Sequence, residues 1–408
     1  MRSCTTQGCC VRHPRACPDT RRTAGSASGH ASPPSPPPPP SNHTERQSAC
    51  LHRGCAHAAA CTVCGGEERV PNRLHFVWVG GGCPPRRALV SLIAAAAHLR
   101  PHAVHLWTRA DSCRGGPVAA CWHAFGAVHR RIPSWEDIAG CRPSLLPRPS
   151  LHHFPSPPSV HTPFFPTLYN FPTAPSALPT CAARSGFATP PSSMIPAHQS
   201  DIIRLHLLNT IGGVYLDSDA FVLRDLSSWR RCDFALGAEW GGPYPPKLNN
   251  GLLLARKGAL FGQQWWRYLQ SWDGAGWDDH SCGWPWRQCE RTPHLVAATP
   301  RLGPLLPPKS FPAAEGAAVA RNLSLLQWRD AVHLVAFRSW VHQSGAALWK
   351  IVEYVLRRAV LAASEAGGGG FNLQQHECVQ RILSAGVSGL WESKGHANAE
   401  AARKKAGG

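Results

Sequence analysis

The chain has 408 residues, and its 43% hydrophobic content is enough for one large domain or two ordinary ones. Its 39 prolines and 37 glycines indicate that part of this length lies outside a packed core. The formal net charge of +18 favours anionic ligands, but no basic run carries the interleaved aromatic residues of a nucleic-acid site. We therefore expect phosphorylated ligands or an anionic surface as partners, and no nucleic acid.

Cysteine usage favours an oxidising, secretory compartment. The chain has 17 cysteines, and glycosylation sequons stand at Asn42 and Asn322. Near the N-terminus, one cluster resembles half of a zinc site, but a lone CxxC is poor evidence and we favour a cysteine-rich leader; the residues of the cluster are Cys55, His57, Cys61 and Cys64. No apolar run approaches the roughly 18 residues of a membrane span, and no signal-peptide core is visible.

The first ordered elements predict an α/β fold. Residues 1–68 read as a low-complexity leader, since the proline run at 32–41 favours an extended polyproline conformation. A β-branched and aromatic run at 73–79 predicts a strand, 85–100 a helix, and 103–107 a second strand. This strand-helix-strand order is typical of a mostly parallel sheet covered by helices.

Regular patterning then fails and returns. Residues 142–196 carry frequent prolines and no sustained period, so we expect a Pro-rich insertion, with translated non-coding sequence as the alternative. We place the main domain at 69–345. Residues 346–408 form a C-terminal segment that begins with an amphipathic helix at 346–364 and continues as a flexible tail.

Chemistry concentrates in one joined pattern. We expect Ser200 to cap a helix that begins at Asp201, with Asp201 and Arg204 on one face of that helix. Gly212 and Gly213 end the helix, and the run after them predicts a strand over 214–217. Acidic residues just beyond it would lie at the carboxyl end of a strand, where open α/β sheets bind ligands.

The acidic pair is Asp217 and Asp219, separated by the small Ser218. Two carboxylates at this spacing can point to one side and bind a hard divalent cation through oxygen. Such a cation stabilises a leaving diphosphate as a Lewis acid, and Arg204 would add a second positive charge. A bare Asp-x-Asp is common by chance, so the capped helix and double glycine before it carry the prediction.

This segment resembles the glycosyltransferase sugar-binding region containing a DXD motif, of the family 32 type that includes α-1,4-galactosyltransferases and initiating mannosyltransferases. The likeness covers residues 70–141 and 197–340. It implies a GT-A type α/β fold, Mn²⁺ or Mg²⁺ as cofactor, and retaining transfer from a UDP- or GDP-sugar to a glycan or glycolipid acceptor. It also implies a Golgi location and membrane association.

The resemblance assigns roles residue by residue. Asp217 and Asp219 form the metal motif with His333 as a third ligand, although a structural histidine is the alternative at His333. Asp201 and Arg204 contact the donor sugar and phosphate, and Arg204 joins the two motif aspartates in the catalytic set. The remaining binding residues implied are Trp78 against the base, Tyr215 and Ser218 at the nucleotide, Asn250 near the acceptor, and Ser339 and Trp340. Without the resemblance, Trp78 and Tyr215 read as core aromatics.

The sequence also departs from the family pattern. Val335 stands where a tryptophan is expected after His333 and Leu334, and residues 277–286 only loosely resemble the acceptor-side loop. A catalytically inactive relative that binds a nucleotide-sugar or glycan is therefore the alternative function. A basic extracellular scaffold is a further alternative, but it leaves the motif unexplained.

Overall fold

The computed structural model describes a set of residues that covers most of the predicted main domain, namely 64–80, 82–109, 113, 115–138, 187–188, 191–239, 247–273, 278–305, 326–334, 337–365 and 370–391. The leader before residue 64, most of the predicted insertion and both sequons lie outside these ranges.

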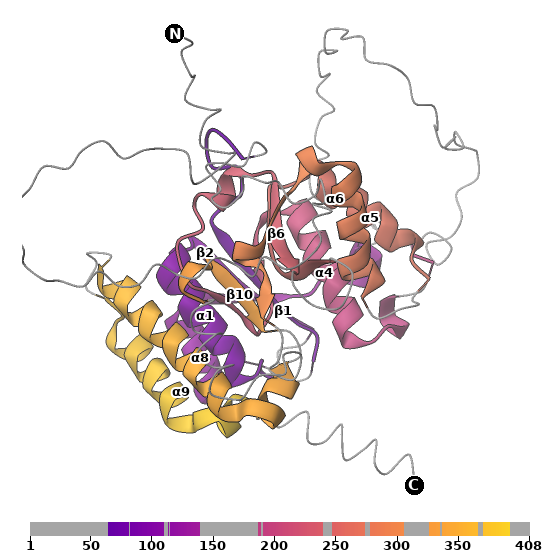
Figure 1. The fold of residues 1–408 in the computed structure, drawn as a ribbon. Coiled ribbons are helices and arrows are strands. Elements are labelled where there is room, and N and C mark those ends of the chain that lie inside the picture. The colour runs from indigo at the N-terminus through magenta and orange to yellow at the C-terminus, as the bar shows by residue number, and fades with distance from the viewer. Residues whose placement is uncertain are drawn as a thin grey trace, which may run out of the picture. The chain divides into compact units, whose positions relative to one another are not determined.

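A seven-stranded mixed sheet forms the centre of the described residues (Figure 1), in the order β3-β2-β1-β4-β7-β6-β8. Neighbouring strands run parallel except where β7 pairs antiparallel with β4 and with β6. The expected α/β class with a mostly parallel sheet is confirmed. The strands are β1 Arg73–Trp78, β2 Ala103–Thr108, β3 Ala127–Arg131, β4 Gly213–Leu216, β6 Phe234–Glu239, β7 Lys247–Ala255 and β8 Ala297–Thr299.

A second, three-stranded sheet has the order β5-β10-β9 and continues from the end of β4. Its strands are β5 Ala220–Val222, β9 Pro304–Leu305 and β10 Ala331–Leu334. β10 pairs antiparallel with β5, so a segment from late in the chain returns to the acidic pair that precedes β5.

Helices cover both faces of the large sheet (Figure 1). On one face lie α1 Arg86–Leu99, α8 Phe337–Glu365 and α9 Leu373–Trp391; on the other lie α4 Pro196–Thr210, α5 Leu260–Ser271 and α6 Trp284–Arg291. The remaining α-helices are α2 Gly116–Ala124 and α3 Trp135–Ile138. Because side chains alternate along a strand, Val214 and Leu216 of β4 pack on the α1 side, while Tyr215 packs on the α4 side.

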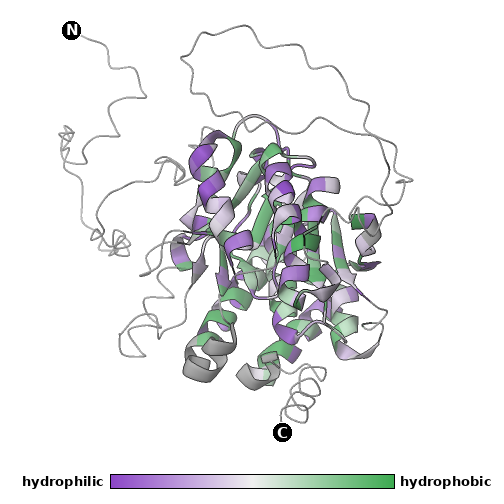
Figure 2. Cartoon of the chain, turned by 90° about the vertical axis from the view of Figure 1, so that its right-hand side faces the viewer, coloured by the Kyte–Doolittle hydropathy of each residue, from purple (hydrophilic) through white to green (hydrophobic). Residues whose placement is uncertain are grey.

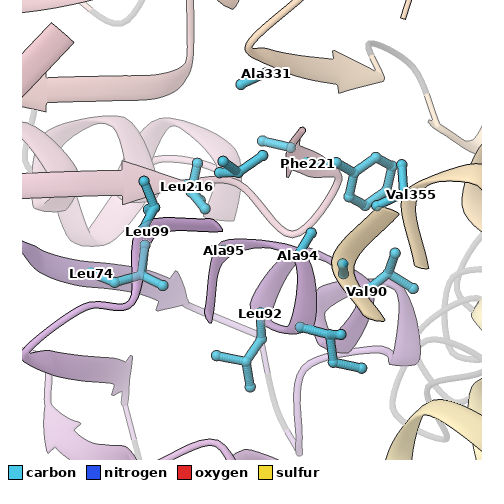
Figure 3. Close-up of a cluster of buried hydrophobic side chains, with 14 of the residues drawn as sticks. Leu74, Val90, Leu92, Ala94, Ala95, Leu99, Leu216, Phe221, Ala331 and Val355 are labelled. Carbon is cyan, nitrogen blue, oxygen red and sulfur yellow. The ribbon is translucent and has the colours of Figure 1, made fainter. Parts of the chain in front are cut away.

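The core on the α1 side joins elements that are far apart in sequence. Leu74, Leu216, Phe221, Ala331 and Val355 converge on α1 from two sheets and α8 (Figure 3). Apolar residues gather between the layers and hydrophilic residues colour the outer helix faces (Figure 2). Burial of these side chains is the main favourable term holding the layers together.

Three sequence predictions of elements are close to the structure. β1, α1 and β2 form the expected parallel strand-helix-strand unit.

The predicted helix start at Asp201 is wrong, because α4 begins at Pro196, five residues earlier. Proline at a first helical position has its φ preset and needs no hydrogen-bond acceptor for its nitrogen, so Pro196 starts the helix and Ser200 lies inside it.

The C-terminal part is more helical than expected. α8 begins at Phe337 and runs across the predicted domain boundary at 345, and a second helix, α9, follows where we expected a flexible tail. A disulfide between Cys121 and Cys378 attaches α9 to α2. No helix within the described ranges is both long enough and apolar enough to span a membrane.

Two further disulfides join Cys64 to Cys232 and Cys83 to Cys113. The first excludes Cys64 from the alternative zinc half-site, because a sulfur bonded to another sulfur is not available as a thiolate ligand. The other members of that cluster lie outside the described residues.

A buried histidine fixes the double glycine that precedes β4. His75 on β1 donates from Nε2 to the carbonyl of Gly212 at 3.0 Å, and its Nδ1 accepts from the indole of Trp107 at 3.1 Å. Gly213 has φ of 125°, and a Cβ there would lie 2.5 Å from the Arg73 carbonyl oxygen. Only glycine fits this close approach of β4 to β1. Burial lowers the pKa of His75 to about 4, although its bond to Gly212 opposes that shift.

We predict that His75 makes the protein acid-labile. Its folded-state pKa of about 4 lies below the ordinary value of 6.5, so the unfolded chain binds a proton first as pH falls. Its contribution to stability is complete above about pH 6.5 and declines toward pH 4, by about 3 kcal/mol in total. Denaturant unfolding at pH 7 and pH 4.5 should show a smaller loss for His75→Gln than for the wild type. The exposed His102→Gln is the control, and an equal loss in all three proteins contradicts the prediction.

Candidate active site

The acidic pair occupies a turn between the two sheets. Asp217 follows β4, and the amide of Ala220 donates to its carbonyl at 3.1 Å, which closes a four-residue turn with Asp219 inside it. Neighbouring strands hold the turn from both sides: the amide of Asp217 donates to Gly251 on β7 at 2.8 Å, and Asp219 accepts from Leu334 on β10 at 3.0 Å. The carboxylates are therefore presented on a rigid backbone.

His333 completes a three-residue cluster. The antiparallel register pairs His333 with Ala220, which brings its ring over the turn. Its Nε2 lies 3.2 Å from an oxygen of Asp219 and 3.8 Å from an oxygen of Asp217. One ligand atom from each of the three side chains lies within 4.8 Å of the other two.

β7 orients the histidine ring. The amide of Gly251 donates to Oδ1 of Asn249 at 3.0 Å, so this atom is an acceptor, and Nδ1 of His333 lies 2.8 Å from it. Nδ1 therefore carries a proton, and Nε2 is directed at the carboxylates. A Cβ on Gly251 would lie 2.4 Å from Nδ1, which explains the glycine after two asparagines.

The charges of the cluster are coupled. Burial lowers the pKa of His333. The hydrogen bond and attraction to Asp219 and the charge of Asp217 together raise this pKa by more than burial lowers it, so the net shift is upward. Burial raises the pKa of Asp217, and Arg204 and His333 only partly oppose this. Burial acts the same way on Asp219, yet the hydrogen bond and charge of His333 together with the charge of Arg87 outweigh it and hold that pKa below its usual range.

The three side chains fit a divalent cation. In the structure Nε2 of His333 faces both carboxylates, and a divalent ion would bind there in place of a proton. Two carboxylate oxygens and one imidazole nitrogen form a mixed donor set, in which carboxylates suit Mg²⁺ or Mn²⁺ and imidazole suits transition metals. Mn²⁺ satisfies both preferences.

Arg204 is enclosed by protein acceptors and is only 6% exposed. It forms ion pairs with Asp201 at 3.1 Å and with Asp217 at 3.1 and 3.2 Å. The carbonyl of Asn250 accepts at 2.8 Å, and the carbonyl and hydroxyl of Ser200 accept at 3.3 and 3.1 Å. These acceptors engage Nε and both terminal nitrogens, so the guanidinium joins two carboxylates within the protein. The expected contact of Arg204 with the donor stays a prediction.

Tyr215 contacts both Arg204 and Asp217 of the same network. The guanidinium carbon of Arg204 lies 4.4 Å from the centre of the Tyr215 ring, and the phenol donates to Asp217. Burial raises the pKa of Tyr215 well above its usual value against the opposing charge of Arg204, so its hydroxyl keeps its proton. With a side chain almost fully buried, Tyr215 acts on the site through Asp217.

Asp201 is held by three donors. One oxygen accepts from the Asn250 amide at 2.8 Å and from Arg204 at 3.1 Å, and the other lies 2.9 Å from Nε2 of His280. The structure thus brings together most of the predicted site residues, namely Asp201, Arg204, Tyr215, Asp217, Asp219, Asn250 and His333.

The other predicted site residues are less closely connected. Ser218 lies in the turn between the two aspartates. Trp78 ends β1 and packs on the core, with its ring so close to Gly80 that a Cβ there would lie 2.9 Å away. Ser339 and Trp340 fall in α8, and their side chains lie outside the described residues. Their binding roles stay predictions.

Sequence reasoning missed Arg87. Ser91 of α1 donates to the carbonyls of Ala220 and Asp217, the latter at 3.3 Å, so this face of α1 contacts the acidic turn. Arg87 precedes Ser91 by one helical turn and lies on the same face. Burial lowers the pKa of Arg87, and the charges of Asp219 and Asp217 oppose that shift. His280 was also missed as a site residue, and so was the contact of Asn249 with His333, since only tertiary packing brings these side chains there.

Comparisons with known proteins identify the region. Residues 161–235 match the family described as "Glycosyltransferase sugar-binding region containing DXD motif". A stretch of 106 residues is 28% identical to Glucan organizing enzyme 1 of Cryptococcus neoformans var. grubii serotype A, covering 24% of this chain and 29% of that protein. The chain therefore spans about three tenths of that relative. The predicted resemblance is confirmed: the chain carries a DXD-containing glycosyltransferase region.

Two solved structures also align. "PaToxG Glycosyltransferase" is 11% identical with a TM-score of 0.29, over 79% of this chain and 88% of that one. A transferase solved as a double cysteine-to-serine mutant is 11% identical with a TM-score of 0.30, over 55% of this chain and 86% of that one. At these scores the likeness carries no weight for fold or activity.

We predict that Asn249→Leu weakens Mn²⁺ binding roughly 10- to 100-fold, the usual cost of losing an outer-shell partner. The variant removes the acceptor that fixes the His333 ring and its proton. Titration of Mn²⁺ followed by electron paramagnetic resonance measures the affinity. Asn209→Leu is the control, because Asn209 bonds the Gly262 carbonyl instead. Equal affinities in both variants would show that Asn249 does not orient a metal ligand.

Proposed function

We propose that this chain, which carries the DXD region of a glycosyltransferase, is a metal-dependent retaining enzyme. It transfers a sugar from a UDP- or GDP-sugar donor to a glycan or glycolipid acceptor. The observation that carries the proposal is the convergence of Asp217, Asp219 and His333, whose ligand atoms lie within 4.8 Å of one another. Retention and the acceptor class rest on the family resemblance alone.

The roles of the site residues follow from their contacts. Asp217, Asp219 and His333 would hold the cation, which when bound stabilises the negative charge of the diphosphate leaving group. Arg204 keeps Asp217 and Asp201 in place, and Asp201 binds the donor sugar. Because Asp201 and the acidic turn are joined through one guanidinium, sugar and diphosphate are held in a defined relative position, which lowers the entropic cost of reaction.

A second cation for the diphosphate is supplied by Arg87. Arg87 lies on the face of α1 that contacts the acidic turn, and the charges of Asp219 and Asp217 act on it. A guanidinium forms paired, charge-assisted hydrogen bonds with phosphate oxygens. Arg87 is therefore the arginine that we expect to contact the nucleotide.

The disulfides support an oxidising compartment, and the family resemblance suggests that it is the Golgi lumen. Three disulfides occur among the described residues, and such bonds persist in oxidising compartments and are rare in the cytosol. Membrane association is proposed from the family resemblance.

We predict that Asp219→Asn lowers Mn²⁺-dependent release of nucleotide from a panel of UDP-glucose, UDP-galactose and GDP-mannose by on the order of 100- to 1,000-fold. Asp219 is a cleaner test than Asp217, because Asp217 also holds Arg204 and Tyr215. Released nucleotide is measured with excess Mn²⁺ and after addition of EDTA.

The control is Asp225→Asn, an exposed aspartate that bonds Ser227. It should keep wild-type turnover, and both variants should keep the wild-type circular dichroism spectrum. Full activity of Asp219→Asn, or activity in EDTA, would refute the metal-dependent assignment. Donor binding by a wild-type protein that never releases nucleotide would favour the inactive relative instead.

We also predict that Arg87→Gln weakens the binding of Mn²⁺–UDP or Mn²⁺–GDP roughly 10- to 100-fold, the range of a charged hydrogen bond. Isothermal titration calorimetry gives the affinities. Arg86→Gln is a matched control, since Arg86 lines a groove beside Cys121 and Cys378. Similar affinities for the two variants would exclude Arg87 from the diphosphate site.

A further inference from the structure

We propose that His280 is a positioning residue that orients Asp201 for the donor sugar. It is supplied by η5, Asp279–Gly283, a single π-helical turn that follows a segment outside the described residues. The proposal rests on the proposed function, because it concerns the site in which Asp201 would bind the sugar.

The contact is direct and buried. Nε2 of His280 lies 2.9 Å from Oδ2 of Asp201, and the His280 side chain is 0% exposed, whereas Asp201 is 12% exposed. His280 therefore does not touch a ligand and can act only through the carboxylate. π-turns within helices are frequent at functional sites, and this one places the histidine against α4.

The proton on the histidine can be assigned from its neighbours. Asp201 also accepts from Asn250 and Arg204, so the carboxylate acts as an acceptor toward all three partners. Nε2 of His280 must then donate. The other ring nitrogen, Nδ1, is buried and has no hydrogen-bond partner among the described residues, which leaves the single ring proton on Nε2.

Three donors fix the orientation of the Asp201 carboxylate. A carboxylate has about four acceptor positions, so the observed bonds leave about one for a substrate hydroxyl. Asn250 and Arg204 hold one oxygen, while His280 alone among the described residues holds the other. Without His280 the carboxylate can rotate, and the remaining acceptor position is no longer fixed.

The ring is itself locked in place. It stacks on Trp272 with centroids 3.7 Å apart and planes at 17°, and His198 packs edge-on at 4.7 Å. The His280 carbonyl accepts from the Trp265 indole at 2.8 Å. These contacts come from α4, α5 and the residue that follows α5, so the turn is a fixed wall of the site.

Two variants of His280 separate the hydrogen bond from the packing. His280→Phe keeps an aromatic ring on Trp272 but cannot donate to Asp201, whereas His280→Gln keeps an amide donor of similar reach but loses the stack. His206→Phe is the control, because His206 lies on the same helix as Asp201 and packs near Trp266, with ring centroids 5.8 Å apart.

Two measurements are made on the full chain: turnover of the same donor panel, and calorimetric affinity for Mn²⁺–UDP and Mn²⁺–GDP. We expect His280→Phe to lose roughly 10- to 100-fold in kcat, the range of a hydrogen bond to a charged group, with nucleotide affinity unchanged within about twofold. His280→Gln should keep most of the wild-type kcat despite a lower melting temperature, and His206→Phe should keep it fully.

Wild-type kcat in His280→Phe would overturn the proposal. So would equal losses in the Phe and Gln variants, which would indicate packing alone, or a loss of nucleotide affinity that matches the loss of kcat. If the wild type releases no nucleotide, the proposed function fails. The inference is then decided by NMR of the imidazole nitrogens, in which an Nε2 proton signal that is unchanged in Asp201→Ala contradicts the contact.

Discussion

The site depends on one buried guanidinium. Arg204 places positive charge between Asp201 and Asp217, two carboxylates from different elements that would otherwise repel each other. A buried charge is tolerable only when it is paired and hydrogen-bonded, and Arg204 meets this requirement with acceptors from α4, β7 and the acidic turn. Removing it would leave the two carboxylates without the cation between them, so the arginine matters for the folding of the site as much as for its chemistry.

The same arrangement explains why the surrounding backbone is so constrained. His75 and the double glycine bring β4 against β1, which sets where the acidic turn begins. Gly251 leaves room for the ring of His333, and Asn249 beside it fixes the direction of that ring. Each of these residues acts at a distance from any ligand, yet each determines the position of a group that would touch one.

Local signals in the sequence predicted the local parts of the structure. Alternating and helical periodicity placed β1, α1 and β2, and the run from Asp201 to Asp219 was recognisable because its helix, glycines and strand follow one another along the chain. Two local signals compete at the start of α4: Ser200 has a side chain that can cap a helix, but Pro196 lies earlier and starts the helix.

Contacts between distant segments could not be predicted in this way. His333 was found through family resemblance, since 114 residues separate it from Asp219. His280 is 79 residues from Asp201, in a segment that resembles the family only loosely, and Arg87 is 130 positions before Asp217 in a helix that carries no motif. No periodicity or spacing rule relates such positions, because only the packed sheets bring them together.

The position of β10, far along the chain from the acidic pair, has a consequence for judging relatives of this chain. The stretch that matches the family model ends at residue 235 and holds Asp201, Arg204 and the acidic pair, but it stops before Asn249, His280 and His333. A protein can therefore retain the whole recognisable motif and still lack the imidazole that faces it. Distinguishing working from degenerate members of such a group requires inspecting the second half of the domain, where the complementary side chains are encoded.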